Sequence, residues 1–341
     1  MTKPSFDPAN LQAFGHAAAG HDGVMSDSSG AVVVKPCTQA EVSFYETVTL
    51  SHPDLSPHLP TFMGTLSLSA DQSAATDIVP DSGVIETATG TERLHGKKLD
   101  TELHIVLENI THGFTKPNVL DLKLGARLWD EDAKPEKRAR LDEVSQKSTS
   151  GSLGFRIAGM RTWMGGETQQ VPEELKQYVE DNEGVRVYNK MYGRKFNAQD
   201  VVEGFWAYVL PGGAEKASQK ELERAREILS YFLGEIRDIQ KAFEAKESRM
   251  YSASLLLVYE GDINEYEKTK EKLTNLSETN ADEDEDEEEE DLPQLATVKV
   301  IDFAHATFQP GQGSDENAIR GMRSTNGILE KMLSEVEKRL D

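Results

Sequence analysis

The sequence predicts a fold that mixes strands and helices, in one large domain or two lobes. The chain has 341 residues, which is enough for either arrangement. Its first hundred residues read as strands and turns with one short helix, whereas long amphipathic helical patterns occupy much of its second half. With 37% hydrophobic and 28% charged residues, the chain can bury a core, which excludes wholesale disorder.

The N-terminal part is predicted to contain several strands, one helix and a long loop region. Residues 30–36 (GAVVVKP) form a β-branched run, and residues 38–48 carry apolar side chains at helical spacing. Residues 51–101 are rich in Ser, Thr, Pro, Gly and Asp, which indicates long loops around one or two strands. The apolar stretch 103–110 is predicted to be a buried strand.

The rest of the chain alternates helical and strand-like segments. In residues 219–250 apolar side chains recur in steps of three and four, so one stripe of this predicted helix faces a core. Residues 251–260 and 297–303 look like two strands joined by a hairpin-like connection. We also expect a helix over 135–147, a strand over 151–163 and a last amphipathic helix with apolar residues from 319 to 336.

The charge is strongly acidic but uneven. The net charge is −23, and residues 282–291 (DEDEDEEEED) supply ten negative charges, which leaves −13 for the other 331 residues. This balance argues against a general nucleic-acid binder, because such a protein needs a basic face to displace counterions from phosphates. The acidic run lies between the last two predicted strands, and we expect a disordered insertion over about 275–295.

The cysteine count and the length of the apolar runs indicate the cellular compartment of the protein. Cys37 is the only cysteine, so neither an intramolecular disulfide nor a cysteine-based zinc site can form. No apolar run approaches the roughly 20 residues of a membrane span, and the first residues lack the apolar region of a signal peptide. A soluble protein in a reducing, intracellular compartment is therefore expected.

Residues 117–125 (PNVLDLKLG) combine an apolar strand with two opposite charges. Side chains two apart on a strand share a face, so Asp121 and Lys123 point the same way while the leucines between and beside them pack behind. A carboxylate and an ammonium presented together suit a site that handles phosphate. A simple ion pair remains the alternative.

Residues 300–306 (VIDFAHA) place a hard oxygen ligand at the end of a strand. Asp302 could hold Mg²⁺ together with nucleotide phosphates, and His305 lies close enough in sequence to reach the same site. The alternative is that these residues are a cap and a surface residue.

Lys35 ends an apolar strand, and Glu41 follows six residues later on the predicted helix. Kinases place a phosphate-binding lysine and its orienting glutamate in this order. Lysines are common at strand ends, so the spacing alone leaves both interpretations open. The glycine-bearing turn at 17–23 (AAAGHDG) matches neither of the standard phosphate-loop patterns.

A basic cluster extends from Lys134 to Arg161. It holds seven cations against three acids, a local balance of +4 within a chain of −23. Salt screens interactions between exposed charges beyond about 8 Å at physiological ionic strength. This patch can therefore bind an anion despite the negative net charge of the chain. A merely solvated helix face is the alternative.

Taken in order, these segments resemble the inositol polyphosphate kinase family, and the resemblance covers nearly the whole chain. The segments that carry it are PNVLDLKLG at 117–125, TSGSLGFRIAGM at 149–160, SASLLLVYEGD at 252–262 and IDFAHA at 301–306, with AAAGHDG at 17–23, VKPCTQAEVSFYE at 34–46 and NKMYGR at 189–194 as further matches.

Within the family, the chain looks most like the fungal inositol polyphosphate multikinases. Its compact length, the acidic insertion and the stretch at 310–321 (PGQGSDENAIRG) carry this likeness. Inositol trisphosphate 3-kinases usually have a longer insertion and a calmodulin-binding helix, whereas only 28 residues separate Gly125 from Gly154 here. Inositol hexakisphosphate kinases share the D-x-K and IDFAH motifs but generally differ near the end of the chain.

The resemblance implies a two-lobed α+β fold like that of protein kinases, with ATP in the cleft between the lobes. Residues 1–110 would form a β-rich N-lobe, and residues 111–341 would form the catalytic and inositol-binding C-lobe. The sequence contains neither H-R-D-x-x-x-x-N nor D-F-G, so an ordinary protein kinase is not expected.

The resemblance also implies roles for individual residues. The catalytic and metal-binding roles fall to Asp121, Lys123 and Asp302, with Asp121 on the ribose, Lys123 between the transferred phosphoryl group and the acceptor, and Asp302 on Mg²⁺. The other ATP-binding residues would be Lys35 at the phosphates, Glu41 beside it, and Glu108, Asn109 and Ile110 at the adenine. Inositol phosphates would be bound by Lys123, Lys137, Arg138, Arg140, Lys190 and His305.

The implied activity is the Mg·ATP-dependent phosphorylation of inositol 1,4,5-trisphosphate to tetrakis- and pentakisphosphates, with phosphatidylinositol 4,5-bisphosphate as a further candidate acceptor. The alternatives are an inositol hexakisphosphate kinase, or a noncatalytic transcriptional cofactor whose acidic tract binds transcription factors or other basic proteins. We expect a monomer in nucleus and cytoplasm with no direct nucleic-acid partner and no transmembrane segment.

Overall fold

The computed structural model describes most of the chain. The described residues are 11–16, 18, 23–68, 84–87, 90–93, 99, 101–165, 171–279 and 293–341. The acidic tract 282–291 and most of the AAAGHDG segment lie outside them. Among the helices that are described, none combines the length and the apolar character needed to cross a membrane.

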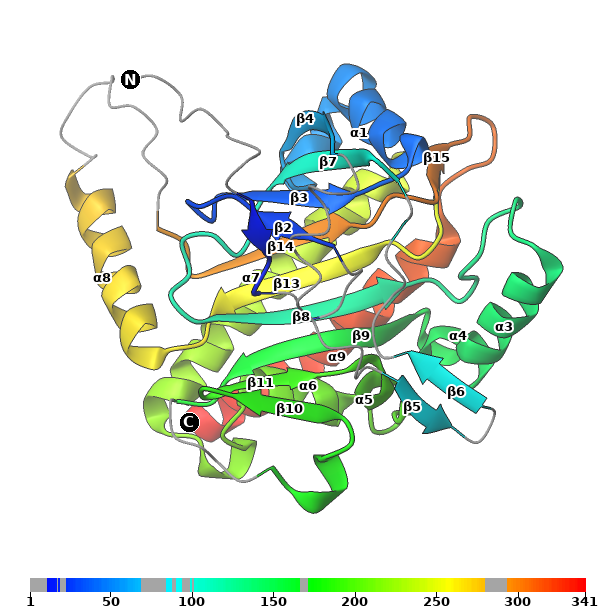
Figure 1. Ribbon diagram of the computed structural model, residues 1–341. Coiled ribbons are helices and arrows are strands. Elements are labelled where there is room, and N and C mark those ends of the chain that lie inside the picture. The colour runs from blue at the N-terminus through cyan, green and yellow to red at the C-terminus, as the bar shows by residue number, and fades with distance from the viewer. Residues whose placement is uncertain are drawn as a thin grey trace.

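Two antiparallel sheets form the framework, one above the other in Figure 1. The first has the order β1 (Gln12–Ala13), β2 (Met25–Ser26), β3 (Val32–Pro36), β7 (Leu103–Glu108) and β4 (Phe62–Ser67). The second has the order β10 (Val179–Asn182), β11 (Val185–Tyr188), β9 (Phe155–Trp163), β8 (Pro117–Leu124), β13 (Ser254–Glu260) and β14 (Ala296–Ile301). Two further pairs are β12 (Ser248–Met250) with β15 (Ala306–Phe308) and β5 (Val84–Thr87) with β6 (Gly90–Arg93). The first sheet is thus built from residues up to 108, and the second begins at residue 117.

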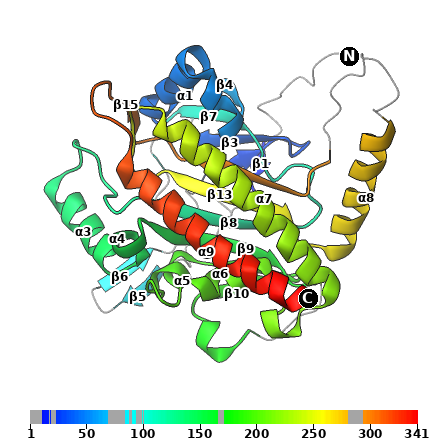
Figure 2. The same ribbon diagram turned by 180° about the vertical axis from the view of Figure 1, so that it is seen from behind.

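The helices divide between the two sheets. Helix α1 (Gln39–Ser51) and the 3₁₀ turn Pro53–His58 follow β3 in the chain, and the turn contacts α1, α7 and β14. The second sheet is accompanied by α3 (Pro135–Gln146), α4 (Thr149–Leu153), α5 (Lys190–Arg194), α6 (Val202–Val209), α7 (Gln219–Glu244), α8 (Ile263–Thr279) and α9 (Glu316–Leu340), with 3₁₀ turns at Glu173–Leu175 and Ala214–Lys216. Helices α7 and α9 run side by side across the back of the second sheet (Figure 2).

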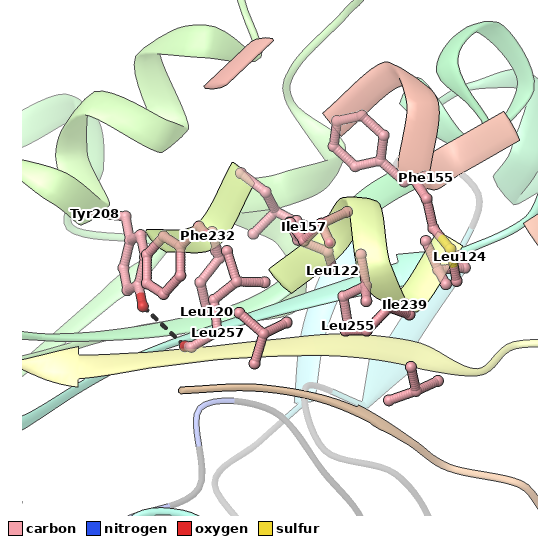
Figure 3. Packing of buried hydrophobic residues seen from close by; sticks show 14 of the residues in the cluster. Leu120, Leu122, Leu124, Phe155, Ile157, Tyr208, Phe232, Ile239, Leu255 and Leu257 are labelled. Atoms are coloured by element: carbon pink, nitrogen blue, oxygen red, sulfur yellow. Dashed lines mark hydrogen bonds between the residues drawn. The ribbon is translucent and has the colours of Figure 1, made fainter. Parts of the chain in front are cut away.

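The main core lies between the second sheet and these helices. Leu120, Leu122 and Leu124 on β8 are fully buried, and Figure 3 shows them packed with side chains from β9, β13, α6 and α7. Burial of each leucine contributes about 1.5 to 3 kcal/mol. Tyr208 on α6 donates its hydroxyl hydrogen to the carbonyl oxygen of Leu257 at 2.8 Å, which satisfies a polar group inside this core. The predicted alternation on β8 is confirmed, because its even-numbered leucines face the core.

Three boundary predictions were wrong. The predicted helix over 219–250 ends at Glu244, because Ser248–Met250 pair with β15 as strand β12. The predicted strand over 151–163 begins only at Phe155, because Ser148 caps helix α4 and Gly154, with φ of +75°, ends it. The insertion predicted from about residue 275 begins too early, since α8 extends to Thr279. In the first two cases the local pattern was compatible with both structures, and tertiary pairing or capping decided between them.

Candidate active site

A cleft of about 140 Å³ lies between the two sheets. Its walls come from β3, β7, β8, β13 and the end of β14, and therefore from both halves of the chain. Six of the residues predicted for the site line it: Lys35, Glu108, Asn109, Ile110, Asp121 and Asp302.

Four charged side chains meet at one end of this cleft. The Nζ atom of Lys35 lies 3.0 Å from Oε1 of Glu41 and 2.6 Å from Oδ1 of Asp302. The Nζ atom of Lys123 lies 3.7 Å from Oδ2 of the same Asp302. Burial opposes the charge of Lys35, but the carboxylates of Asp302 and Glu41 outweigh it and raise the pKa of Lys35 well above its usual range. Lys35 is therefore a permanent cation, as phosphate binding requires.

Glu41 is placed by the start of helix α1. The Thr38 hydroxyl caps the helix and accepts a hydrogen bond from the backbone N–H of Glu41. The Glu41 side chain is only 1% exposed and reaches Lys35 from the first helical turn, where the helix dipole favours an acidic group.

Asp302 adopts an unusual backbone conformation. Its φ of +68° lies in the left-handed region, which costs a non-glycine residue about 1 kcal/mol or more. The next residue, Phe303, is fully buried and stacks on Phe44 of α1 with ring centroids 4.4 Å apart. This stack anchors the turn after β14 to the helix that carries Glu41, so the two carboxylates beside Lys35 are held by one packing unit.

Asp121 is buried with an unsatisfied acceptor. Its side chain is 5% exposed, and Oδ1 has no hydrogen-bond partner in the described part of the chain. Burial raises the pKa of Asp121 to about 6, while the Lys123 ammonium opposes that shift. Buried polar atoms are normally paired, so an orphaned carboxylate oxygen at the cleft wall suits a hydroxyl group of a ligand.

The residues predicted to contact the adenine brace the segment between the sheets. The Glu108 carboxylate accepts hydrogen bonds from the backbone N–H and the hydroxyl of Thr61, at 3.0 and 2.8 Å. The Asn109 amide donates to the Gly30 carbonyl oxygen at 2.6 Å, and its Oδ1 accepts from Thr111. Ile110 packs in a small apolar cluster. The polar atoms of both side chains thus hold the segment between the sheets in place, a role that sequence analysis did not predict.

Apart from Lys123 on β8, the predicted inositol-binding residues come from three separate segments. On α3, Lys137 and Arg140 are exposed, whereas Arg138 donates to the carbonyl oxygens of Ala133 and Glu131. Lys190 begins α5, which packs against β9. His305, on the turn after Asp302, contacts Asp130. His305 follows Asp302 by three residues, so a short stretch of chain connects it to the charged cluster around Lys35.

Sequence analysis counted Arg156 only as part of the basic cluster and gave no role to Arg194, whose charge acts on Arg156. Arg156 on β9 is the cross-strand partner of Lys123, and its guanidinium donates to the Ser150 hydroxyl at 3.0 Å. Burial and the neighbouring Arg194 guanidinium lower the pKa of Arg156 to about 10. The signal was available, because a single cation alternates with the buried Phe155 and Ile157 on a predicted strand.

The residues around Asp302 fit a metal ion that arrives with a nucleotide. Across the described residues, three or more His, Cys, Asp or Glu side chains never gather in one metal-binding group. Magnesium is commonly held by one or two carboxylates together with phosphate oxygens and water. A single carboxylate between two lysines matches that pattern better than it matches an all-protein cage.

Comparison with known proteins assigns the family. A family model described as inositol polyphosphate kinase matches residues 104–330. The inositol polyphosphate multikinase of Saccharomyces cerevisiae is 32% identical, over 94% of this chain and 98% of the relative. The inositol hexakisphosphate kinase 1 of Rattus norvegicus is 29% identical, over 71% of this chain but 55% of the relative.

The crystal structure of the inositol phosphate multikinase from Saccharomyces cerevisiae, in complex with ADP and Mn²⁺, is also similar. It superposes with a TM-score of 0.62 at 31% identity and covers 89% of this chain and 100% of that chain. The predicted family and the kinase-like α+β fold are confirmed. This chain belongs to the inositol polyphosphate kinase family.

Proposed function

We propose that this protein is a Mg·ATP-dependent inositol polyphosphate multikinase that converts inositol 1,4,5-trisphosphate to tetrakis- and pentakisphosphates. The observation that carries the proposal is the cluster of Lys35, Asp302 and Lys123 at the end of a cleft, with contacts of 2.6 and 3.7 Å. Two cations and one metal-binding carboxylate at one point are what two anionic reactants need in order to approach each other.

On the nucleotide side, Lys35 binds the ATP phosphates and Glu41 keeps its ammonium in place. The segment 108–110 borders the adenine, and its braced side chains leave the backbone and the buried Ile110 side chain to face the base. The orphaned Oδ1 of Asp121 accepts a hydrogen bond from a ribose hydroxyl.

Asp302 holds magnesium together with phosphate oxygens. When bound, the metal neutralises charge on the phosphoryl group that is transferred. The left-handed backbone of Asp302 aims the carboxylate into the cleft between the two lysines.

On the acceptor side, Lys123 lies between the transferred phosphoryl group and the acceptor hydroxyl. Its ammonium is directed by a hydrogen bond of 3.0 Å to the Ser252 carbonyl oxygen, which leaves its other hydrogens for the reactants. The inositol phosphates are bound by Lys137, Arg138, Arg140, Lys190 and His305. Arg156, the cross-strand partner of Lys123, and its neighbour Arg194 are additional cations. Each charge-assisted hydrogen bond contributes about 1.5 to 3 kcal/mol, so a few of them account for micromolar binding.

Product analysis by anion-exchange chromatography tests the proposal. Incubation with Mg·ATP and inositol 1,4,5-trisphosphate should give tetrakis- and then pentakisphosphate. Lys123→Ala should abolish the products, and Lys338→Ala, which removes an exposed lysine near the end of α9, should not. Failure of the wild-type protein to give more product than Lys123→Ala would overturn the proposal.

The same assay decides between the proposal and an inositol hexakisphosphate kinase. Inositol hexakisphosphate as the acceptor should give no pyrophosphate product. The match to the rat hexakisphosphate kinase spans 55% of that relative, whereas the match to the yeast multikinase spans 98%. Phosphatidylinositol 4,5-bisphosphate in mixed micelles is the test for a lipid acceptor.

A second function through the acidic tract is proposed from its composition. Ten consecutive acids, residues 282–291, favour basic protein partners such as transcription factors. Strand β14 pairs with β13 along its whole length, from Ile301 with Ser254 to Ala296 with Tyr259, so deletion of the tract should leave the cleft and catalysis intact. Binding to a basic protein, measured by titration, should fall. The monomeric state and a location in nucleus and cytoplasm stay predictions.

A further inference from the structure

His305 is held by a carboxylate from a distant loop. Its Nδ1 atom lies 2.5 Å from Oδ2 of Asp130, across a sequence separation of 175 residues. His305 belongs to the turn that follows Asp302, and Asp130 belongs to the loop that follows β8, the strand of Asp121 and Lys123. The contact therefore joins the two segments that carry the proposed catalytic residues.

The chemistry of this contact fixes the state of the imidazole ring. An ionised carboxylate can only accept hydrogen bonds, so Nδ1 must carry the hydrogen. The second ring nitrogen, Nε2, is then the atom that remains for a ligand, and the His305 side chain is 38% exposed. In a ring whose Nδ1 carries a hydrogen, Nε2 donates a hydrogen bond only in the imidazolium form.

Side-chain contacts hold the loop that carries Asp130 in place. The guanidinium groups of Arg127 and Arg138 both lie over the ring of Trp129, at 4.0 and 4.7 Å from the ring centroid. Its indole N–H donates to Asp142 of α3 at 2.6 Å.

The start of the same loop is tied to α9. The backbone N–H groups of Ala126 and Arg127 both donate to Oδ1 of Asn317 at 2.9 Å. A carboxylate on such a braced loop can orient a partner side chain, whereas one on a freely moving loop could not.

We propose that Asp130 is a positioning residue for the acceptor substrate. It holds the His305 imidazole through Nδ1, so that Nε2 faces a phosphate group of the inositol phosphate and donates a hydrogen bond to it in the imidazolium form of the ring. This inference rests on the proposed function, because it takes His305 as a phosphate ligand. Asp130 itself is 24% exposed and acts through the ring rather than on the substrate.

A measurement without substrate tests the first half of the inference. Proton–nitrogen correlation spectra of the imidazole rings report which nitrogen of each histidine carries the hydrogen, and the His305→Gln spectrum assigns the signal among the eight histidines. At a pH where His305 is neutral, the wild-type ring should be protonated at Nδ1, and Asp130→Ala should shift it towards Nε2. A wild-type ring protonated at Nε2, or no change in Asp130→Ala, would overturn the inference whatever the activity is.

Steady-state kinetics test the second half. Asp130→Asn keeps an acceptor of the same shape but loses the charge, and it should raise KM for inositol 1,4,5-trisphosphate about five- to tenfold while kcat and KM for ATP stay near wild type. Asp132→Asn, an identical change at an exposed residue of the same loop, is the matched control and should leave all three constants unchanged.

A double variant separates positioning from general damage. If Asp130 acts through His305, then Asp130→Asn added to His305→Gln should raise KM no further than His305→Gln alone. Multiplicative effects of the two changes, or an equal rise in KM for ATP, would contradict the inference. Absence of kinase activity in the wild-type protein would instead contradict the proposed function, and the spectra would still report on the contact.

Discussion

The Nζ atom of Lys35 and the Oδ1 atom of Asp302 lie 2.6 Å apart although 267 residues separate them in the chain. Lys35 belongs to the first sheet and Asp302 follows the last strand of the second. The ion pair thus crosses the cleft, and Glu41 and Lys123 extend it on either side. The predictions below follow from this cluster and from the packing that supports it.

Removal of Lys35 should destabilise the fold through Glu41. Lys35→Met leaves a carboxylate that is only 1% exposed without its cation, and an unpaired buried charge of this kind costs about 3 to 5 kcal/mol. The double variant Lys35→Met/Glu41→Gln should recover most of the free energy of unfolding in urea but no activity.

Lys241→Met is the matched control for that experiment. Lys241 pairs with Asp238 at 2.9 Å, but both side chains are largely exposed, so its loss should cost less than about 1 kcal/mol. Equal stability of Lys35→Met and Lys241→Met would show that the pair beside Glu41 is not effectively buried.

Asp302 should be required for turnover because of its carboxylate. Two substitutions separate the loss of the carboxylate from the effect on the strained backbone. Asp302→Asn preserves a residue type that tolerates a positive φ, whereas Asp302→Ala does not and should lose about 1 kcal/mol more stability. Both should lower kcat by roughly 10² to 10³, because each removes the carboxylate. Near-normal turnover in Asp302→Asn, measured beside the exposed control Asp238→Asn, would refute the assignment of the metal ligand.

Asp121 should lower stability above its pKa. Because burial raises the folded-state pKa from 3.8 to about 6, the ionised group destabilises the fold fully above pH 6 and not at all below about pH 4. Asp121→Asn should therefore be more stable than wild type at pH 7.5, by about 1 to 3 kcal/mol, with the difference vanishing towards pH 4. Its affinity for ATP should fall.

Thermal unfolding across this pH range, with Asp132→Asn as the exposed control, measures the effect of Asp121. A stability difference that grows as the pH falls would have the wrong sign and would refute the role of burial at Asp121.

Gly193 should be intolerant of any side chain. A Cβ atom at this position of α5 would lie 1.9 Å from the Ile157 carbonyl oxygen of β9, and a backbone atom in a central strand cannot move away cheaply. Gly193→Ala should therefore lower the melting temperature and raise KM for the inositol phosphate, because α5 carries Lys190 and Arg194.

Gly234→Ala in α7 is the opposite control. A Cβ atom added at Gly234 would have open space around it within 4 Å, as far as the described residues are concerned, so the change should stabilise the helix by up to about 1 kcal/mol. A harmless Gly193→Ala would mean that α5 is not seated closely on β9.

Several parts of the site could be predicted from local patterns. In residues 120–124 leucines alternate with Asp121 and Lys123, so the core face and the cleft face of this strand were both identifiable. The spacing of Lys35 and Glu41 placed one on a strand and the other in the first turn of a helix, and the structure joins them at 3.0 Å. Both are short-range relationships, which periodicity and capping control.

Other parts depended on contacts that no local pattern contains. The side chains of Glu108 and Asn109 are bound to Thr61 and Gly30, on segments far away in the chain. Residues 248–250 continue a helical pattern but pair as a strand with residues 306–308. Here the partner of a segment decided its structure.

The sequence by itself determined the family, the β8 alternation and the identity of the charged residues, because motif spacing and side-chain period are properties of neighbouring positions. Only the tertiary structure decided that Asp302 lies between Lys35 and Lys123 and that Asp130 holds His305. Electrostatic interactions between charged groups depend on distances in space, and those distances are set by how the two sheets and their loops pack, not by separation along the chain.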